Sequence, residues 1–127
     1  MAADGGDGDR ATVAGALRLG AGWQDSERDD VLARLSQLDN RLKSFRADEV
    51  DMELSVKERG GPQQKVTLEC WLAGLPRVVG TGEEPDLMRG LTRARDEVIT
   101  QITQVLGRRE PKANRHLRES VRGADAG

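Results

Sequence analysis

Residues 50–72 read VDMELSVKERGGPQQKVTLECWL, and this stretch decides the fold. In each half of it every second residue is apolar, which is typical of a strand with one buried face and one exposed face. Gly60-Gly61-Pro62 separates the two halves, and glycine and proline together favour a turn. The stretch therefore predicts a β-hairpin, with strands over about residues 49–58 and 64–74.

A helical pattern precedes the hairpin. Ser26 suits the N-cap position, and Asp29 can return a hydrogen bond to the Ser26 backbone N–H. The next apolar residues have helical spacing and form one stripe: Val31, Leu35, Leu38, Leu42 and Phe45. We expect one helix that ends near Phe45 or Arg46.

Three further elements complete the pattern. Residues 12–19 predict a short first strand, and residues 75–79 predict a fourth strand that Gly80-Thr81-Gly82 closes. A second helix is expected to start around Pro85 and to end with Gly107 as its C-cap. Its apolar stripe consists of Leu87, Leu91, Ala94, Val98, Ile102 and Val105.

The element order is thus β-α-β-β-β-α, an α+β fold. Because each helix has one apolar stripe, the economical arrangement is a four-stranded sheet with both helices packed on one face. We expect this domain to span residues 12–106. Residues 1–11 are expected to form a disordered acidic tail, and residues 107–127 a basic flexible tail.

Composition narrows the possible functions. The chain has 127 residues and a net charge of −2, with net −4 over residues 1–30 and net +3 over residues 107–127. A polyanion would therefore meet local basic patches instead of a basic protein. Aromatic residues make up only 2% of the chain. This argues against an RNA binder that stacks unpaired bases on its sheet.

Cysteine and histidine are too scarce for most site chemistry. Cys70 is the only cysteine, so an intrachain disulfide is impossible and a reducing cytosol is expected. His116 is the only histidine and falls in the expected tail. No metal-ligand spacing and no phosphate loop are present. We therefore expect a non-enzymatic protein without a cofactor or metal, and the absence of a signal pattern or long apolar run predicts a cytoplasmic location.

Two sets of residues are candidates for binding. Basic side chains with the spacing or position to contact phosphates are Arg34, Arg41, Arg89, Arg93, Arg95, Arg108, Arg109, Lys112, Arg115 and Arg118. The alternative for the helix arginines is a solvated surface, and for the tail a solubilising role. Trp71, on the polar phase of its strand, suits a partner interface, or alternatively a partly covered position at the sheet edge.

The second helix contains short sequence motifs that match a known family pattern. That pattern opens with Asp-Met, continues with an aliphatic residue, and ends with Asp-Lys-Leu and Arg-Gln-Leu. The corresponding residues here are Asp86-Leu87, Leu91, Asp96-Glu97-Val98 and Thr100-Gln101-Ile102, with Val78-Val79-Gly80-Thr81 as the last strand. In these motifs and in the element order, residues 12–106 resemble the short form of the ribosome hibernation-promoting factors, also called ribosome-associated inhibitors or sigma-54 modulation proteins.

The resemblance implies a non-catalytic protein of the same β-α-β-β-β-α fold. Such proteins bind rRNA of the small ribosomal subunit in the cleft between head and body, inhibit translation, and preserve idle ribosomes under stress. Glu97, Thr100 and Gln104 depart from the family, which has basic residues that face rRNA at these positions. The alternative function is a protein-interaction module on the same fold, which would use the exposed sheet face and would not bind ribosomes.

Overall fold

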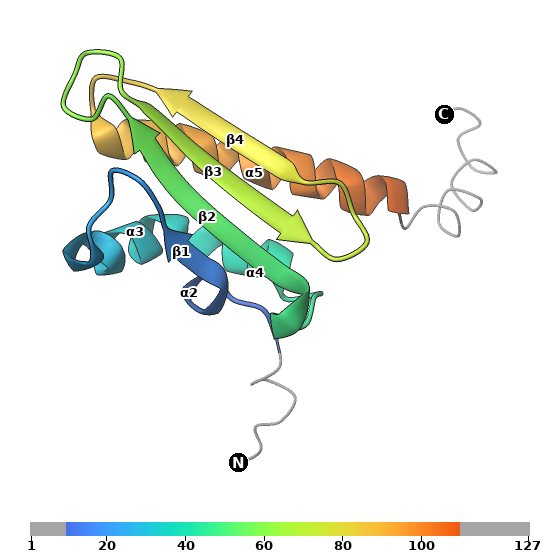
Figure 1. Cartoon of the computed structure of the whole chain (residues 1–127). Coiled ribbons are helices and arrows are strands. Elements are labelled where there is room, and N and C mark those ends of the chain that lie inside the picture. Colours follow the sequence, from blue (N-terminus) through green and yellow to red (C-terminus); the bar gives the residue numbers. More distant parts are fainter. Residues whose placement is uncertain (1–9, 110–127) are drawn as a thin grey trace, which may run out of the picture.

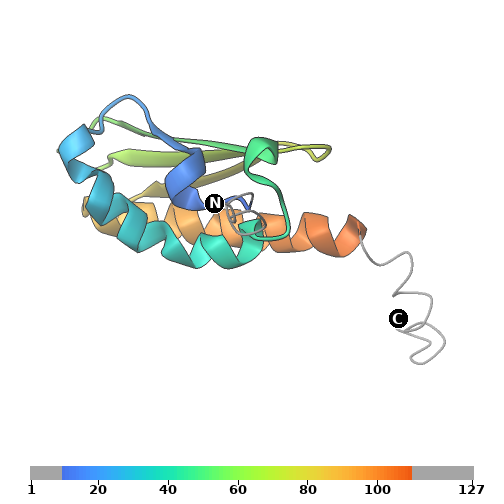
Figure 2. The same ribbon diagram turned by 90° about the horizontal axis from the view of Figure 1, so that it is seen from below.

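The computed structural model describes residues 10–109 and contains one four-stranded mixed sheet (Figure 1). The strands are β1 (Leu17–Leu19), β2 (Val50–Lys57), β3 (Lys65–Leu72) and β4 (Val78–Glu83), in that spatial order. β1 is parallel to β2, and the other neighbours are antiparallel. The helices after β1 are α3 (Arg28–Leu35), α4 (Asp39–Leu42) and α5 (Leu87–Arg109). All three cover the same face of the sheet (Figure 2), which confirms the expected α+β architecture.

The hairpin forms the centre of the core. Met52 pairs with Cys70 and Leu54 with Leu68, and all four side chains are fully buried beneath the helices. The alternation therefore puts the apolar residues of both strands on the buried face, as expected, and a slip of one residue would expose this entire apolar row. Burial raises the pKa of the Cys70 thiol to about 12, with a smaller contribution from the charge of Asp51.

The fourth strand differs from the sequence prediction. β4 spans Val78–Glu83, so Gly80 and Gly82 lie inside the strand and do not close it. The reason is the close approach of α5. A Cβ on Gly82 would overlap the backbone of Gly90, and a Cβ on Gly80 would lie 2.8 Å from Val98 Cγ2 and overlap the Ala94 carbonyl oxygen. Glycine here provides space for a helix backbone, and sequence reasoning interpreted it as a turn signal.

The first helix is broken, where one continuous helix was expected. It consists of η1 (Asp25–Glu27), α3, η2 (Ser36–Leu38) and α4, and it ends at Leu42. The capping box at its N-terminus is formed by Gln24 and Glu27, so the prediction that Ser26 and Asp29 would cap the helix was wrong. The Ser36 hydroxyl donates to the Ala33 carbonyl at 3.0 Å, and such back-bonding by serine perturbs the helical hydrogen-bond ladder. The tighter 3-10 turn keeps the apolar stripe facing the sheet.

The N-terminal segment also differs from the expected strand. Residues 12–19 divide into α2 (Val13–Ala16), which the Thr12 side chain caps, and the three-residue β1. Arg10 and Ala11, which the sequence placed in the tail, are part of the fold. Arg10 forms a β-bridge with Arg46, and Ala11 is buried. A last short element, η3 (Ala47–Glu49), leads into β2.

Helix side chains cover the outer edges of the sheet. At β4, Glu97 accepts a hydrogen bond from the Thr81 N–H at 2.8 Å, and Gln101 contacts both the N–H and the carbonyl of Val79. At β1, the Arg28 guanidinium donates to the Leu17 carbonyl at 3.1 Å. These bonds occupy backbone groups to which another strand would pair, so they oppose edge-to-edge association.

The hydrogen bond from the Thr81 N–H to Glu97 leads to a prediction about stability. Glu97→Lys removes the acceptor for the Thr81 N–H, and we expect the free energy of unfolding to fall by about 1 kcal/mol. Glu97→Gln keeps an acceptor oxygen and should unfold like the wild type. Chemical denaturation of the three proteins makes the comparison, and equal stability of the Lys and Gln variants would contradict the role given to this bond.

Candidate nucleic-acid interface

Two helical segments lie side by side on the face of the molecule away from the open sheet surface (Figure 2). Arg95 Nη1 donates to the Arg34 carbonyl at 3.0 Å, and Arg41 Nε donates to Thr103 Oγ1 at 3.0 Å. Residue numbers rise together along both partners, so α3 and α4 run in the same direction as α5. We call the line of contact defined by Arg34, Arg41, Arg95 and Thr103 the helix seam.

Arg95 is the most fixed cation of the helix seam. Its side chain is only 14% exposed, and its Nε and Nη2 both donate to Asp96 Oδ1, at 3.0 and 2.8 Å. Three of the five guanidinium N–H groups are thus used within the protein, which leaves two for a ligand. Arg34 is exposed, and its guanidinium forms no ion pair or hydrogen bond with any residue that the structure describes. The helix seam therefore combines one positioned cation with one available cation.

A groove of about 520 Å³ opens beside these two arginines. It lies between α3 with the following 3-10 turn on one side and the first half of α5 on the other. Its lining consists of Asp30, Ala33, Arg34, Ser36, Gln37, Met88 and Arg95. We call it the α3–α5 groove. Ser36, at the break of the first helix, is one of its lining residues, and sequence reasoning missed this break.

The structure does not bring all the predicted helix arginines together. Arg93 forms an ion pair with Glu84 at 2.7 Å and its Cβ lies near Gly82, so it is beside β4. Two residues correspond to 200° around a helix, which puts Arg93 on the side of α5 opposite Arg95. Arg89 is exposed on the outer surface of α5. A single ridge of Arg34, Arg41, Arg89 and Arg93 is therefore not formed.

The basic tail is described only at its start. Arg108 and Arg109 are the last residues of α5, so Gly107 lies inside the helix and the prediction that it forms the C-cap was wrong. Lys112, Arg115, His116 and Arg118 lie outside the described residues.

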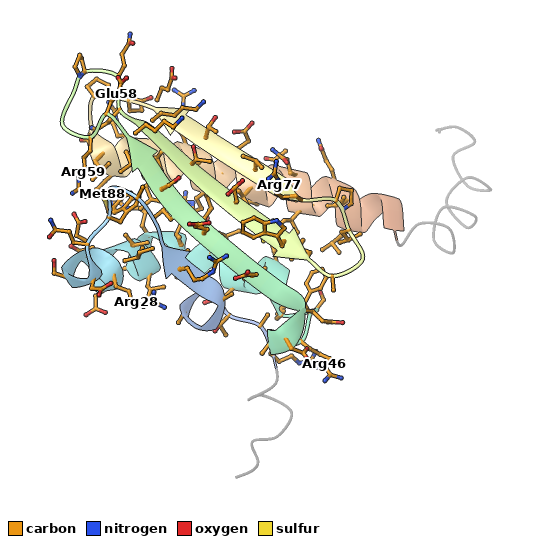
Figure 3. The ribbon with its side chains drawn as sticks, viewed as in Figure 1. Arg28, Arg46, Glu58, Arg59, Arg77 and Met88 are labelled. Atoms are coloured by element: carbon orange, nitrogen blue, oxygen red, sulfur yellow. The ribbon has the colours of Figure 1, made fainter. Side chains whose placement is uncertain are left out.

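Trp71 lies on the open face of the sheet, as expected, and is half-buried. The Arg18 guanidinium lies 5.8 Å from the centre of its ring and forms ion pairs with Asp51 at 3.0 Å and Glu53 at 3.9 Å. Farther along the sheet, Arg77 pairs with Glu69 at 3.2 Å (Figure 3). These charges are neutralised within the face itself, which leaves little for a partner to gain.

A second arginine–tryptophan contact fixes the start of the first helix, and no pattern in the sequence predicts it. Arg59, in the hairpin loop, lies 5.3 Å from the centre of the buried Trp23 ring and forms an ion pair with Glu27. Its hydrogen bonds, together with the Gln24 N–H, lower the pKa of Glu27 to about 2. This cluster joins the hairpin to the helix that carries Arg34.

Residues 10–109 contain no group of three or more acidic, histidine or cysteine side chains placed to hold a metal ion. None of the helices in this part of the chain is both long and apolar enough to cross a membrane.

The fold defines a class: small α+β domains with a four-stranded mixed sheet and helices on one face. A solved structure of similar fold is the N-terminal domain of Protein Y from Thermus thermophilus. It matches this chain with a TM-score of 0.56 and 23% sequence identity, over 71% of this chain and 98% of that domain. No family model matches the sequence, and no curated protein matches it.

Proposed function

We propose that this protein is a non-catalytic, cytoplasmic ribosome-associated factor. It binds rRNA of the small subunit through the helix seam, inhibits translation, and preserves idle ribosomes under stress. The fold is similar to that of the Protein Y N-terminal domain, and the resemblance of residues 12–106 to the ribosome hibernation-promoting factors supports this role. The observation that carries the proposal is the pair Arg34 and Arg95, which converge on one groove with unused hydrogen-bond donors.

The chemistry of the helix seam suits a structured RNA. Phosphate contacts from arginine position a protein on RNA by shape and do not read sequence. Arg34 and Arg41 are seven residues apart and therefore separated by about 10 Å along the helix axis. Two cations at such a spacing can reach different phosphates of one RNA backbone.

The position of Glu97 supports a shift of the basic surface within this fold. Its carboxylate bonds to the Thr81 N–H at the β4 edge, where it serves the sheet. A family lysine at this position would be free to face rRNA, whereas Glu97 bonds to the sheet edge, so in this proposal the rRNA contacts come from the arginines of the helix seam instead. The ion-paired open face gives less support to the alternative function, a protein-interaction module that uses Trp71.

Sedimentation tests the proposal. In a low-salt sucrose gradient of starved cells, we expect the protein to co-migrate with the small subunit or with whole ribosomes. Raising the salt concentration should release it, because neutralised phosphates recover their counterions. A protein that stays at the top of the low-salt gradient would show that the ribosome is not its partner.

The contribution of the basic tail is tested separately. Deleting residues 110–127 removes Lys112, Arg115 and Arg118 but leaves α5 complete. We expect weaker ribosome binding, with a smaller salt dependence, because contacts to phosphates are lost. The melting temperature should not change, because the deletion leaves every described element intact. If the full-length and truncated proteins have equal affinity, the tail contributes only solubility.

A further inference from the structure

We propose that the α3–α5 groove binds one guanine nucleotide. The base would lie against Met88 and Ala33 with its Watson–Crick edge at Asp30, and the phosphate would lie between Arg34 and Arg95. The inference goes beyond ribosome association, because it concerns the identity of one base. It applies equally to a free nucleotide and to an unpaired guanosine within RNA.

The first argument is an unmade ion pair. Asp30 and Arg34 are four residues apart on α3, a spacing at which an acid and a base normally meet. Both line the groove, yet no ion pair joins them. Within residues 10–109 neither charged group has an ion-pair partner, so the groove is lined by one acid and one base that can each contact a ligand. This suits a ligand with donors at one end and negative charge at the other.

The second argument concerns the phosphate end. Arg95 is held by the Arg34 carbonyl and by Asp96, so little side-chain entropy is lost when it binds a ligand. Its two remaining N–H groups and the Arg34 guanidinium can form charge-assisted hydrogen bonds, which are the strong ones for phosphate. Among the groove residues, these two carry the positive charge.

The third argument identifies the base. A carboxylate only accepts hydrogen bonds. Guanine offers it two adjacent donors, N1–H and the exocyclic amine, whereas adenine and cytosine each place an acceptor beside their amine, and uracil flanks its single N–H with carbonyls. Asp30 therefore selects guanine, while Gln37 and Ser36 can bond to the ribose or to the remaining base edge. The volume of about 520 Å³ is within the range of small-ligand sites.

Calorimetric titration of the full chain tests this site with 5′-GMP and 5′-AMP, and with the single-stranded tetranucleotides UUGU and UUAU. We expect the guanine member of at least one pair to bind tenfold or more tightly than its adenine counterpart. Asp30→Asn should abolish that preference, because an amide presents a donor as well as an acceptor. Asp29→Asn is the matched control, since Asp29 is exposed on the same turn but lies outside the groove lining.

The possible results distinguish unpaired RNA from free nucleotide as the ligand, and the guanine site from ribosome binding. Preference for UUGU without GMP binding would assign the site to unpaired RNA, and binding of both would admit free nucleotide. Equal binding of guanine and adenine ligands, no binding of any, or an undiminished preference in Asp30→Asn would overturn the proposal. Ribosome co-sedimentation of the same variants tests the proposed function independently, because it depends on phosphate contacts that Asp30→Asn retains.

Discussion

Gly82→Ala is expected to lower the free energy of unfolding by about 3 kcal/mol, because the added methyl group meets backbone that cannot move aside. The new Cβ would lie 2.9 Å from the Gly90 carbonyl carbon and 3.0 Å from Arg93 Cβ. α5 would have to lift from β4 and open the core along its length. For a domain of this size the melting temperature should fall by roughly 10–20 °C, measured by circular dichroism.

Gly107→Ala is the matched control in the same helix. A Cβ at Gly107 meets nothing within 4 Å, and alanine has the higher helix propensity, so this change should stabilise the protein by up to about 1 kcal/mol. If both alanine variants melt like the wild type, the tight approach of α5 to β4 is not a determinant of stability.

The second large effect is on binding. Replacing Arg34 and Arg41 together with glutamate should weaken ribosome association by about 3 kcal/mol, roughly a hundredfold, through lost phosphate contacts and new repulsion. The melting temperature should change little, because a surface charge contributes only about 0–1 kcal/mol and the lost hydrogen bond from Arg41 to Thr103 about 1 kcal/mol. Quantitative co-sedimentation measures the first quantity and thermal denaturation the second.

A double variant on the other side of the sheet separates contact from total charge. Lys57→Glu with Lys65→Glu changes the net charge by the same amount, and these two exposed residues face each other across β2 and β3. It should keep most of the ribosome affinity. If the two double variants lose affinity equally, the effect is one of net charge and the helix seam is not the binding surface.

Sequence reasoning succeeded where pattern and burial coincide. The hairpin and the two apolar stripes were predicted because each is periodic over many residues, and the core follows from them. It failed at Gly80, Gly82 and Gly107, since glycine as a turn or cap and glycine beneath a packed helix look alike along a single chain. Only the position of α5 distinguishes these roles.

The candidate site was less predictable for a related reason. The sequence could name Arg34 and Arg41 as candidates, but the groups that bond to the Arg34 carbonyl and the Arg41 guanidinium, on Arg95 and Thr103, come from 61 and 62 residues away. The α3–α5 groove is lined by residues of α3, of the 3-10 turn at Ser36 and of α5. Neither that turn nor the direction of α5 is encoded as a period, so no pattern search could assemble this set.

The burial of Cys70 has a consequence for how the protein can be studied. With a pKa of about 12, only roughly one thiol in 10⁵ is ionised at neutral pH, and the thiolate is the reactive form. Cys70 sits in the middle of β3 with no exposed surface, so a thiol reagent reaches it only when the sheet separates. The rate at which a thiol reagent modifies the chain's one cysteine therefore reports how often the core opens, and no cysteine has to be introduced for this measurement.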